Sequence, residues 1–207
     1  MLETAKVEQK DKMVKTTTQP RQTYITWKDF KRRYLSREDG FKYEWIDGKI
    51  EKTKRTMNPN QFYIWRNMVN FLTELEQKQG EKVGMFPMEA DIFLQKVLHR
   101  IPDICYFTLQ QIENAADNEV VIPEFVVEVI SESDNINRVN RKINEYFTAG
   151  VKIVWHIFPE LKEVYVYNEG GKTIKVCRDD DICSAETVIE GFAMTVNQIF
   201  RRDKKEN

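Results

Sequence analysis

Apolar residues recur at helical spacing in three segments of the chain. The first, residues 26–36, has Thr26 as a candidate N-cap and is followed by a stop at Gly40. The second runs from Asn60 to Gly80, and its apolar face consists of Ile64, Met68, Phe71, Leu72 and Leu75. The third covers residues 135–150. The spacing therefore predicts a short helix, a long helix and one further helix late in the chain.

Apolar runs in the remaining segments predict strands. Residues 41–56 are typical of two strands joined at Asp47-Gly48, a dipeptide that favours a tight hairpin turn. Further strands are expected in residues 82–95, 100–107, 124–130, 151–158, 164–177 and 196–200. Strands and helices are thus mixed along the chain, which predicts an α/β or α+β fold with a mixed sheet flanked by helices.

The polar ends of the chain set the expected domain limits. Residues 1–23 lack apolar periodicity and predict a flexible arm, residues 24–202 a single domain, and residues 203–207 a charged tail. The N-terminal residues contain no apolar stretch long enough for a signal peptide or a membrane span, so we expect a cytoplasmic protein with no membrane partner.

Composition excludes several classes of function. The 207 residues include 32 Lys and Arg against 33 Asp and Glu, so a net charge of −1 gives no overall attraction to nucleic acid. Three cysteines without CxxC spacing argue against a disulfide framework and a structural zinc site. Two distant histidines give little support to zinc chemistry or a Ser-His-Asp triad, and the glycines form no nucleotide-binding loop. Acidic residues are the remaining candidates for chemistry.

Two carboxylates occur in segments that otherwise predict buried strands. Glu128 shares a strand face with Val126 and Ile130, and the opposite face is apolar too, which indicates a central strand. Asp103 follows a proline near the start of another strand. If these strands are neighbours, the repulsion between the carboxylates must be relieved by a proton, by Arg or Lys, or by a divalent cation. Oxygen ligands favour magnesium or manganese, which points to phosphodiester substrates.

The helix expected after Glu128 offers a basic partner. Five of its residues share one side at helical spacing: Arg138, Lys142, Glu145, Tyr146 and Ala149. Lys142 lies in the middle of this side, where a partly desolvated amine could accept a proton or act as a fixed charge against a phosphorus centre.

Four motifs in order resemble a known family. The segments YEWIDGKI, PDICYF, FVVEVISES and RKINEYFTAGVKIVWHIF are similar to the Uma-type putative restriction endonuclease family, a branch of the PD-(D/E)XK nuclease superfamily. The resemblance covers residues 25–200 and implies a restriction-endonuclease-like core. It implies that Asp103 and Glu128 are metal ligands and that the backbone carbonyl of Val129 is a further ligand. It also implies that Glu44 is an accessory acid.

The chain departs from the family pattern at several positions. The usual superfamily lysine two residues after the glutamate is replaced by Ile130, and the resemblance implies that Lys142 on the next helix supplies the amine. Glu132 replaces a frequent proline, and Arg138 a frequent aspartate. A histidine common at the start of the long helix is absent from residues 60–62.

Each candidate also has a simpler interpretation. Glu128 could be a structural carboxylate paired with an arginine, and Asp103 a polar residue at the start of a strand. Glu44 could form an ion pair within the hairpin, with Lys42 or Lys49. Lys142 could be a surface lysine. A basic hairpin could contact a phosphate backbone or be solvated, and it comprises Lys49, Lys52, Lys54 and Arg55.

The sequence leads to one main hypothesis and two alternatives. The first is an endonuclease dependent on Mg²⁺ or Mn²⁺ that cuts DNA, with Asp103 and Glu128 as metal ligands and Lys142 orienting or deprotonating the water. The second is a nuclease-fold module that binds DNA or a protein partner without turnover. The third is a purely structural oligomer. A homodimer is compatible with each of them.

Overall fold

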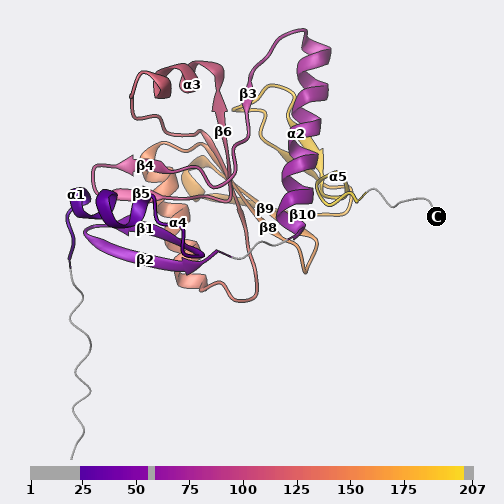
Figure 1. Cartoon of the computed structure of the whole chain (residues 1–207). Helices are drawn as coiled ribbons and strands as arrows, with labels where there is room; N and C mark the ends of the chain where they lie inside the picture. Colours follow the sequence, from indigo (N-terminus) through magenta and orange to yellow (C-terminus); the bar gives the residue numbers. More distant parts are fainter. Residues whose placement is uncertain (1–23, 56–58, 203–207) are drawn as a thin grey trace, which may run out of the picture.

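The computed structural model of the chain describes residues 24–55 and 59–202 (Figure 1). The expected arm, residues 1–23, and the expected tail, residues 203–207, lie outside the described residues. Three sheets are present in the described part. No helix within it is both long and apolar enough to cross a lipid bilayer.

The largest sheet has six strands in the order β10-β9-β8-β7-β6-β3. Its members are β3 (Gly84–Met85), β6 (Ile104–Thr108), β7 (Phe125–Val129), β8 (Ile153–Phe158), β9 (Glu163–Asn168) and β10 (Thr173–Arg178). The strands β7 and β8 are parallel, and the other neighbours are antiparallel. The sheet is therefore mixed, as the sequence predicted.

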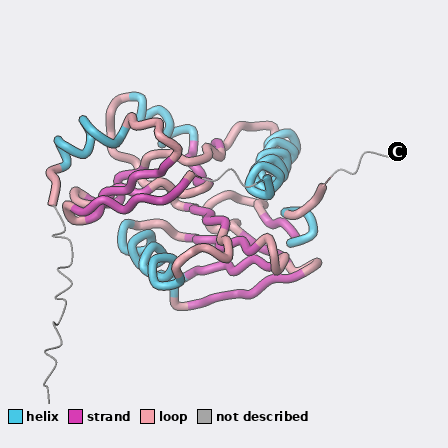
Figure 2. Tube along the Cα trace, turned by 60° about the horizontal axis from the view of Figure 1, so that its bottom comes forward, coloured by secondary structure: helices cyan, strands magenta, loops and turns pink. Residues whose placement is uncertain are grey.

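Strand β7 is central, and all five of its residues are buried. Phe125, Val127 and Val129 pack with the apolar face of helix α2 (Pro59–Gln79), whereas Val126 packs with helix α4 (Ile136–Ala149) on the other face. The two long helices therefore cover opposite faces of the sheet, as the cartoon and the Cα tube show (Figures 1 and 2). Glu128 points to the α4 side by the same alternation.

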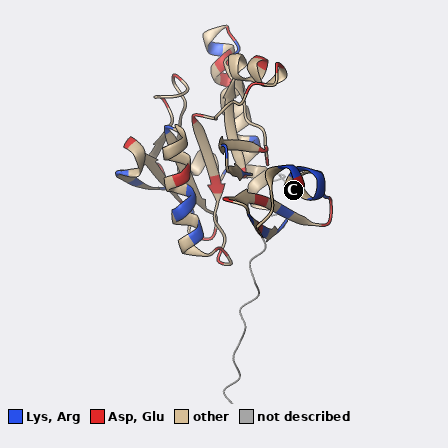
Figure 3. Ribbon diagram, turned by 90° about the vertical axis from the view of Figure 1, so that its left-hand side faces the viewer, with Lys and Arg blue, Asp and Glu red and all other residues tan. Residues whose placement is uncertain are grey.

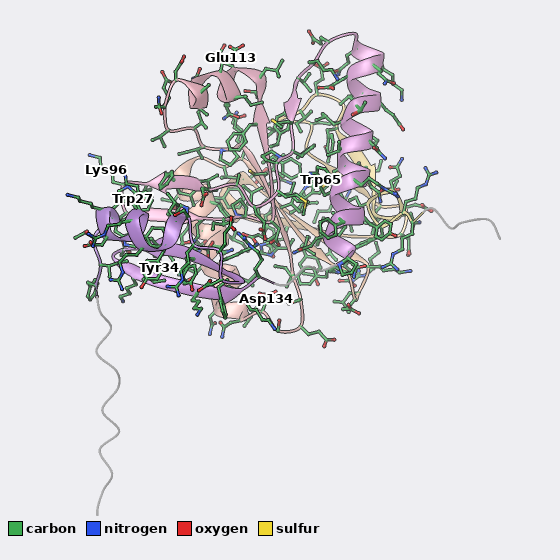
Figure 4. The ribbon with its side chains drawn as sticks, in the orientation of Figure 1. Trp27, Tyr34, Trp65, Lys96, Glu113 and Asp134 are labelled. Carbon is green, nitrogen blue, oxygen red and sulfur yellow. The ribbon has the colours of Figure 1, made fainter. Side chains whose placement is uncertain are left out.

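The second sheet has the order β2-β1-β5-β4. Its strands are β1 (Phe41–Ile46), β2 (Lys49–Lys54), β4 (Ile92–Gln95) and β5 (Leu98–Arg100). The predicted hairpin turn is present, because Asp47 and Gly48 both have positive φ angles, 46° and 77°. Thr26 caps α1 (Trp27–Phe30), which continues into the π-helical turn η1 (Lys31–Leu35) and covers one face of this hairpin (Figure 4).

Several segments differ from the expected elements. Residues 196–200 form helix α5 (Val196–Ile199) and not a strand, because Thr195 and Gln198 make a reciprocal capping box. The strand β12 (Ala193–Thr195) precedes this helix and pairs with β11 (Ile182–Ser184). Helix α3 (Leu109–Ala116) was not expected, although Thr108 and Gln111 form the same box. Residues 82–95 divide into β3 and β4, which belong to different sheets. The turn η2 (Glu169–Gly171) joins β9 to β10.

Candidate functional site

A pocket of about 500 Å³ lies where the β1–β2 hairpin faces the ends of β7 and α4. Asp103, Glu128, Lys142 and Glu44 all line it, although they come from four separate parts of the chain. Val129 lines it too. The structure thus brings together every residue that the sequence suggested for metal binding or catalysis. The loop that carries Asp134 forms part of the wall beside the open end of the hairpin (Figure 4).

Glu128 occupies the deep part of the pocket and is 6% exposed. Its Oε1 accepts hydrogen bonds from Lys142 Nζ at 3.0 Å and from the Tyr146 hydroxyl at 2.5 Å. Both of these hydrogen bonds are thus made to the same carboxylate oxygen. Burial raises the pKa of Glu128; Lys142 opposes this rise, but the nearby carboxylates of Asp103 and Glu44 add to it. The negative charge at Glu128 is therefore only partly compensated by protein groups.

Asp103 lies just before β6 and connects β7 to the hairpin. Its Oδ2 accepts the backbone N–H of Val129 at 2.8 Å, and its Oδ1 accepts Lys42 Nζ at 2.8 Å. Lys42 also reaches Glu89 at 3.0 Å. Burial alone would lower the pKa of Lys42, but the surrounding carboxylates raise it above its ordinary value. The amine therefore stays charged.

Lys42 is a site residue that the sequence reasoning missed as such. The sequence suggests Lys42 only as an ion-pair partner of Glu44, whereas in the structure Lys42 pairs with Asp103 and Glu89. Its position two residues before Glu44 on β1 was the available signal, since residues two apart on a strand share a face.

Glu44 is held by a set of donors and not by the hairpin lysines. Arg100 Nη1 lies 3.0 Å from Oε2, the backbone N–H of Ile101 lies 3.0 Å from Oε1, and Lys142 Nζ lies 3.4 Å from Oε1. Burial alone would raise the pKa of Glu44, but Lys142, Arg100 and the Ile101 N–H lower it to about 2. Glu44 is thus a buried, ionised carboxylate.

Arg100 is fully buried and binds three glutamates. Besides Glu44, it donates to Glu51 of β2 at 2.9 Å and to Glu145 of α4 at 2.6 Å. Arg141 of α4 also pairs with Glu51. These bonds fasten the hairpin sheet to α4 directly behind the pocket. No local pattern in the sequence indicates this arginine, because its partners are 45 to 56 residues away.

Helix α4 delivers Lys142 and Tyr146 to Glu128. The helix begins at the cap Asn135, whose side chain accepts the N–H groups of Asn137 and Arg138, and ends at Gly150 with φ 110°. Burial lowers the pKa of Lys142, but Glu128 and Glu44 outweigh this effect and raise it above its ordinary value. The amine of Lys142 is therefore an ammonium ion at neutral pH.

The basic hairpin residues do not form one surface. Lys52 and Lys54 line the pocket, and Lys52 also lies over the Phe41 ring. Lys49 is at the turn, over the ring of Tyr24, and Arg55 pairs with Glu89. Acidic and basic residues are interspersed along the elements around them (Figure 3).

The donor set is small but compatible with a hard cation. Among residues 24–55 and 59–202 there is no group of three or more His, Cys, Asp or Glu placed to hold a metal. Magnesium, however, often uses only one or two carboxylates and completes its shell with water and phosphate oxygens. Asp103 and Glu128 supply two carboxylates. The raised pKa of Glu128 indicates that the protein stabilises its ionised form poorly, and a bound cation would stabilise that form. Lys42 and Lys142 would share these carboxylates with the cation.

Comparisons with known proteins agree with this fold. The family model described as Uma2, putative restriction endonuclease, matches residues 27–197. The crystal structure of a putative nuclease from Anabaena variabilis superposes with a TM-score of 0.69 at 19% sequence identity, covering 85% of this chain and 97% of the other. A comparison with curated proteins gives no match. The predicted restriction-endonuclease-like fold is thereby confirmed.

Proposed function

Because the chain belongs to the Uma2 family of putative restriction endonucleases, we propose that it is a metal-dependent endonuclease that hydrolyses phosphodiester bonds of DNA. The observation that carries the proposal is the convergence of Asp103, Glu128 and Lys142 in one pocket. Carboxylates beside a charged amine are suited to a phosphoryl centre, where negative charge increases in the transition state.

The residues have distinct roles in this proposal. Asp103 and Glu128, with the Val129 carbonyl, would hold Mg²⁺ or Mn²⁺, which supplies positive charge next to the scissile phosphate. Lys142 acts as a fixed ammonium that orients the attacking water and opposes charge on the phosphate oxygens. Without a bound metal, Glu128 and Glu44 raise the pKa of Lys142, which favours its ammonium form. Glu44, through its 3.4 Å contact with Lys142, holds that amine in place.

The pocket wall supplies the contacts with the nucleic-acid backbone. Lys52 and Lys54 line the pocket from β2, and Arg138 lines it from α4. Arg138 donates to Thr53 of the hairpin at 2.9 Å, so it is oriented across the pocket edge. Phosphate contacts of this kind give affinity without sequence information.

Plasmid cleavage tests the proposal. With Mg²⁺ or Mn²⁺ the purified protein should convert supercoiled plasmid to open and linear forms, and chelation of the metal should stop it. Glu128→Gln should lower the cleavage rate by about 100-fold or more, since changes in outer-shell groups already cost 10- to 100-fold. The matched control is Glu76→Gln, a glutamate of α2 that is also 6% exposed but lies outside the pocket. Equal rates in the two variants would refute the proposal.

One observation favours a second function, a nuclease-fold module that binds DNA or a protein without cutting. Each candidate ligand already has a lysine counterion, Lys42 at Asp103 and Lys142 at Glu128. Such pairs could remove the affinity for a cation. Calorimetric titration with Mn²⁺ separates the two functions: heat that saturates below millimolar concentration and disappears in Glu128→Gln supports the nuclease, and no heat in the native protein supports the module.

A further inference from the structure

His156 is a buried residue of the pocket that the mechanism above leaves unused. It lies on β8 directly opposite Glu128 of β7 in the parallel register, so the two side chains point to the same face of the sheet. The residue is 1% exposed and lines the pocket together with Lys142. Its ring packs edge-on against Tyr167, with the ring centres 4.9 Å apart, which fixes its plane.

The Nε2 atom of His156 is buried and has no hydrogen-bond partner within the described part of the chain. A buried polar atom of this kind is costly unless a ligand or an ordered water satisfies it. Trp155 Nε1 also lacks a partner there, but the Trp155 side chain belongs to the apolar cluster on the α2 face. Of these two atoms, His156 Nε2 is the one whose side chain lines the pocket.

The surrounding groups indicate what kind of ligand would satisfy it. The amines of Lys42 and Lys142 each contact two carboxylates, at 3.0 and 2.8 Å for Lys42 and at 3.4 and 3.0 Å for Lys142. Since an ammonium has three N–H donors, each amine retains only one for a phosphate oxygen. A phosphate group entering the pocket still needs donors for its non-bridging oxygens. A neutral imidazole in the Nε2–H form supplies such a donor without adding a charge.

We propose that His156 is a substrate-binding residue whose Nε2–H donates to a non-bridging oxygen of the phosphate group bound beside Glu128. The inference rests on the proposed function for the location of the phosphate. It adds a direct contact from β8, opposite the hairpin lysines. Substrate phosphate would therefore be bound from the sheet side as well as from the pocket wall.

Imidazole ¹⁵N NMR tests this contact directly. The chain has only two histidines, and His99→Gln identifies the signals of each. Thymidine 5′-phosphate, which has no diester to cut, is titrated in buffer with Mg²⁺. The His156 Nε2 signal should shift with saturation while the His99 signals stay constant. The proposal is overturned if the chemical shift of His156 Nε2 does not change. That result would mean that the mononucleotide binds elsewhere, that it does not bind, or that only an ordered water satisfies Nε2.

Substitutions provide an independent readout. His156→Leu fills the space without a donor and should weaken thymidine 5′-phosphate binding about 10-fold, the value of one hydrogen bond. His156→Gln places an amide near the Nε2 position and should retain most of the affinity. Trp155→Phe, which removes the buried N–H on the opposite face, should leave affinity unchanged. Equal affinity in the Leu and Gln variants would contradict the proposal, and thermal unfolding confirms that each variant is folded.

The two proposals fail in different ways. If the His156 signal responds to the mononucleotide but plasmid stays uncut, the phosphate contact is supported and the endonuclease function is refuted. If plasmid is cut but the ¹⁵N chemical shift of His156 Nε2 does not change, the endonuclease function is supported and the phosphate contact is refuted.

Discussion

At the residue scale, two glutamates in one pocket differ in their charge balance. Glu44 is surrounded by Arg100, Lys142 and a backbone N–H, which lower its pKa to about 2 despite burial. Glu128 has burial and two carboxylates against one ammonium and one hydroxyl, and its pKa is raised. Compensation is therefore complete at Glu44 and incomplete at Glu128. This difference favours Glu44 as a positioning residue and Glu128 as the ligand.

The lowered pKa of Glu44 predicts a loss of stability in acid. A depressed carboxyl pKa stabilises the fold above the unfolded value of 4.5, and this contribution is lost as the pH falls towards 2. By pH 3 about 2 kcal/mol should be lost through this group. In Glu44→Gln, urea unfolding should show a correspondingly smaller change between pH 7 and pH 3. Glu119→Gln, at an exposed position, serves as the control. The prediction is contradicted if the free energy of unfolding of Glu44→Gln falls between pH 7 and pH 3 as much as that of the native protein.

At the scale of the element, close backbone approach decides where the short strand β3 can pair. A β-carbon on Gly84 would lie 2.2 Å from the Phe107 carbonyl oxygen and 2.7 Å from the Tyr106 ring. Only glycine therefore permits β3 to add to the edge of β6. The same contact lets the Tyr106 hydroxyl reach the Val83 carbonyl at 2.9 Å.

Gly84→Ala should destabilise the protein by more than about 2 kcal/mol, because the added carbon meets rigid backbone. The matched control is Gly40→Ala, at φ 80° with open space around it, which should cost only about 1 kcal/mol. Free energies of unfolding from urea titration measure both. Similar values for the two variants would show that β3 can move away from β6 at little cost.

At the scale of the whole molecule, Arg100 joins the two larger sheets. It comes from β5 of the hairpin sheet and binds Glu145 on α4, which covers the six-stranded sheet. Removing one partner of a buried ion network leaves charges without compensation, which typically costs 3–5 kcal/mol. The pocket lies between the parts that this arginine connects, so its shape depends on Arg100 although Arg100 does not line it.

Arg100→Met should therefore lower the free energy of unfolding by about 3–5 kcal/mol. Lys152→Met, which breaks a surface pair with Glu124 in which the lysine side chain is 53% exposed, should cost less than about 1 kcal/mol. Urea unfolding compares the two variants. A small effect of Arg100→Met would mean that apolar packing alone holds the hairpin sheet in place.

Features that depend on local chain chemistry can be predicted from the amino-acid sequence alone. The Asp47-Gly48 turn, the helix that carries Lys142, and the buried strand with Glu128 follow from residue types at short spacing. Short apolar segments were less certain: residues 196–200 became α5 because a capping box outweighed the apolar run. The strand patterns suggested that Asp103 and Glu128 meet if their strands are neighbours, and the family resemblance added the expectation that both are metal ligands.

The pairing of charged side chains, in contrast, depends on how distant elements pack together. Lys42 binds Asp103 across 61 residues of sequence, and Arg100 reaches Glu44 across 56. The side chain of His156 reaches the pocket because the register of β8 against β7 places it beside Glu128. Such contacts depend on strand order and on the packing of α4, which no local pattern encodes. Periodicity fixes the face on which a side chain lies, whereas its partner is fixed by the element that packs against that face.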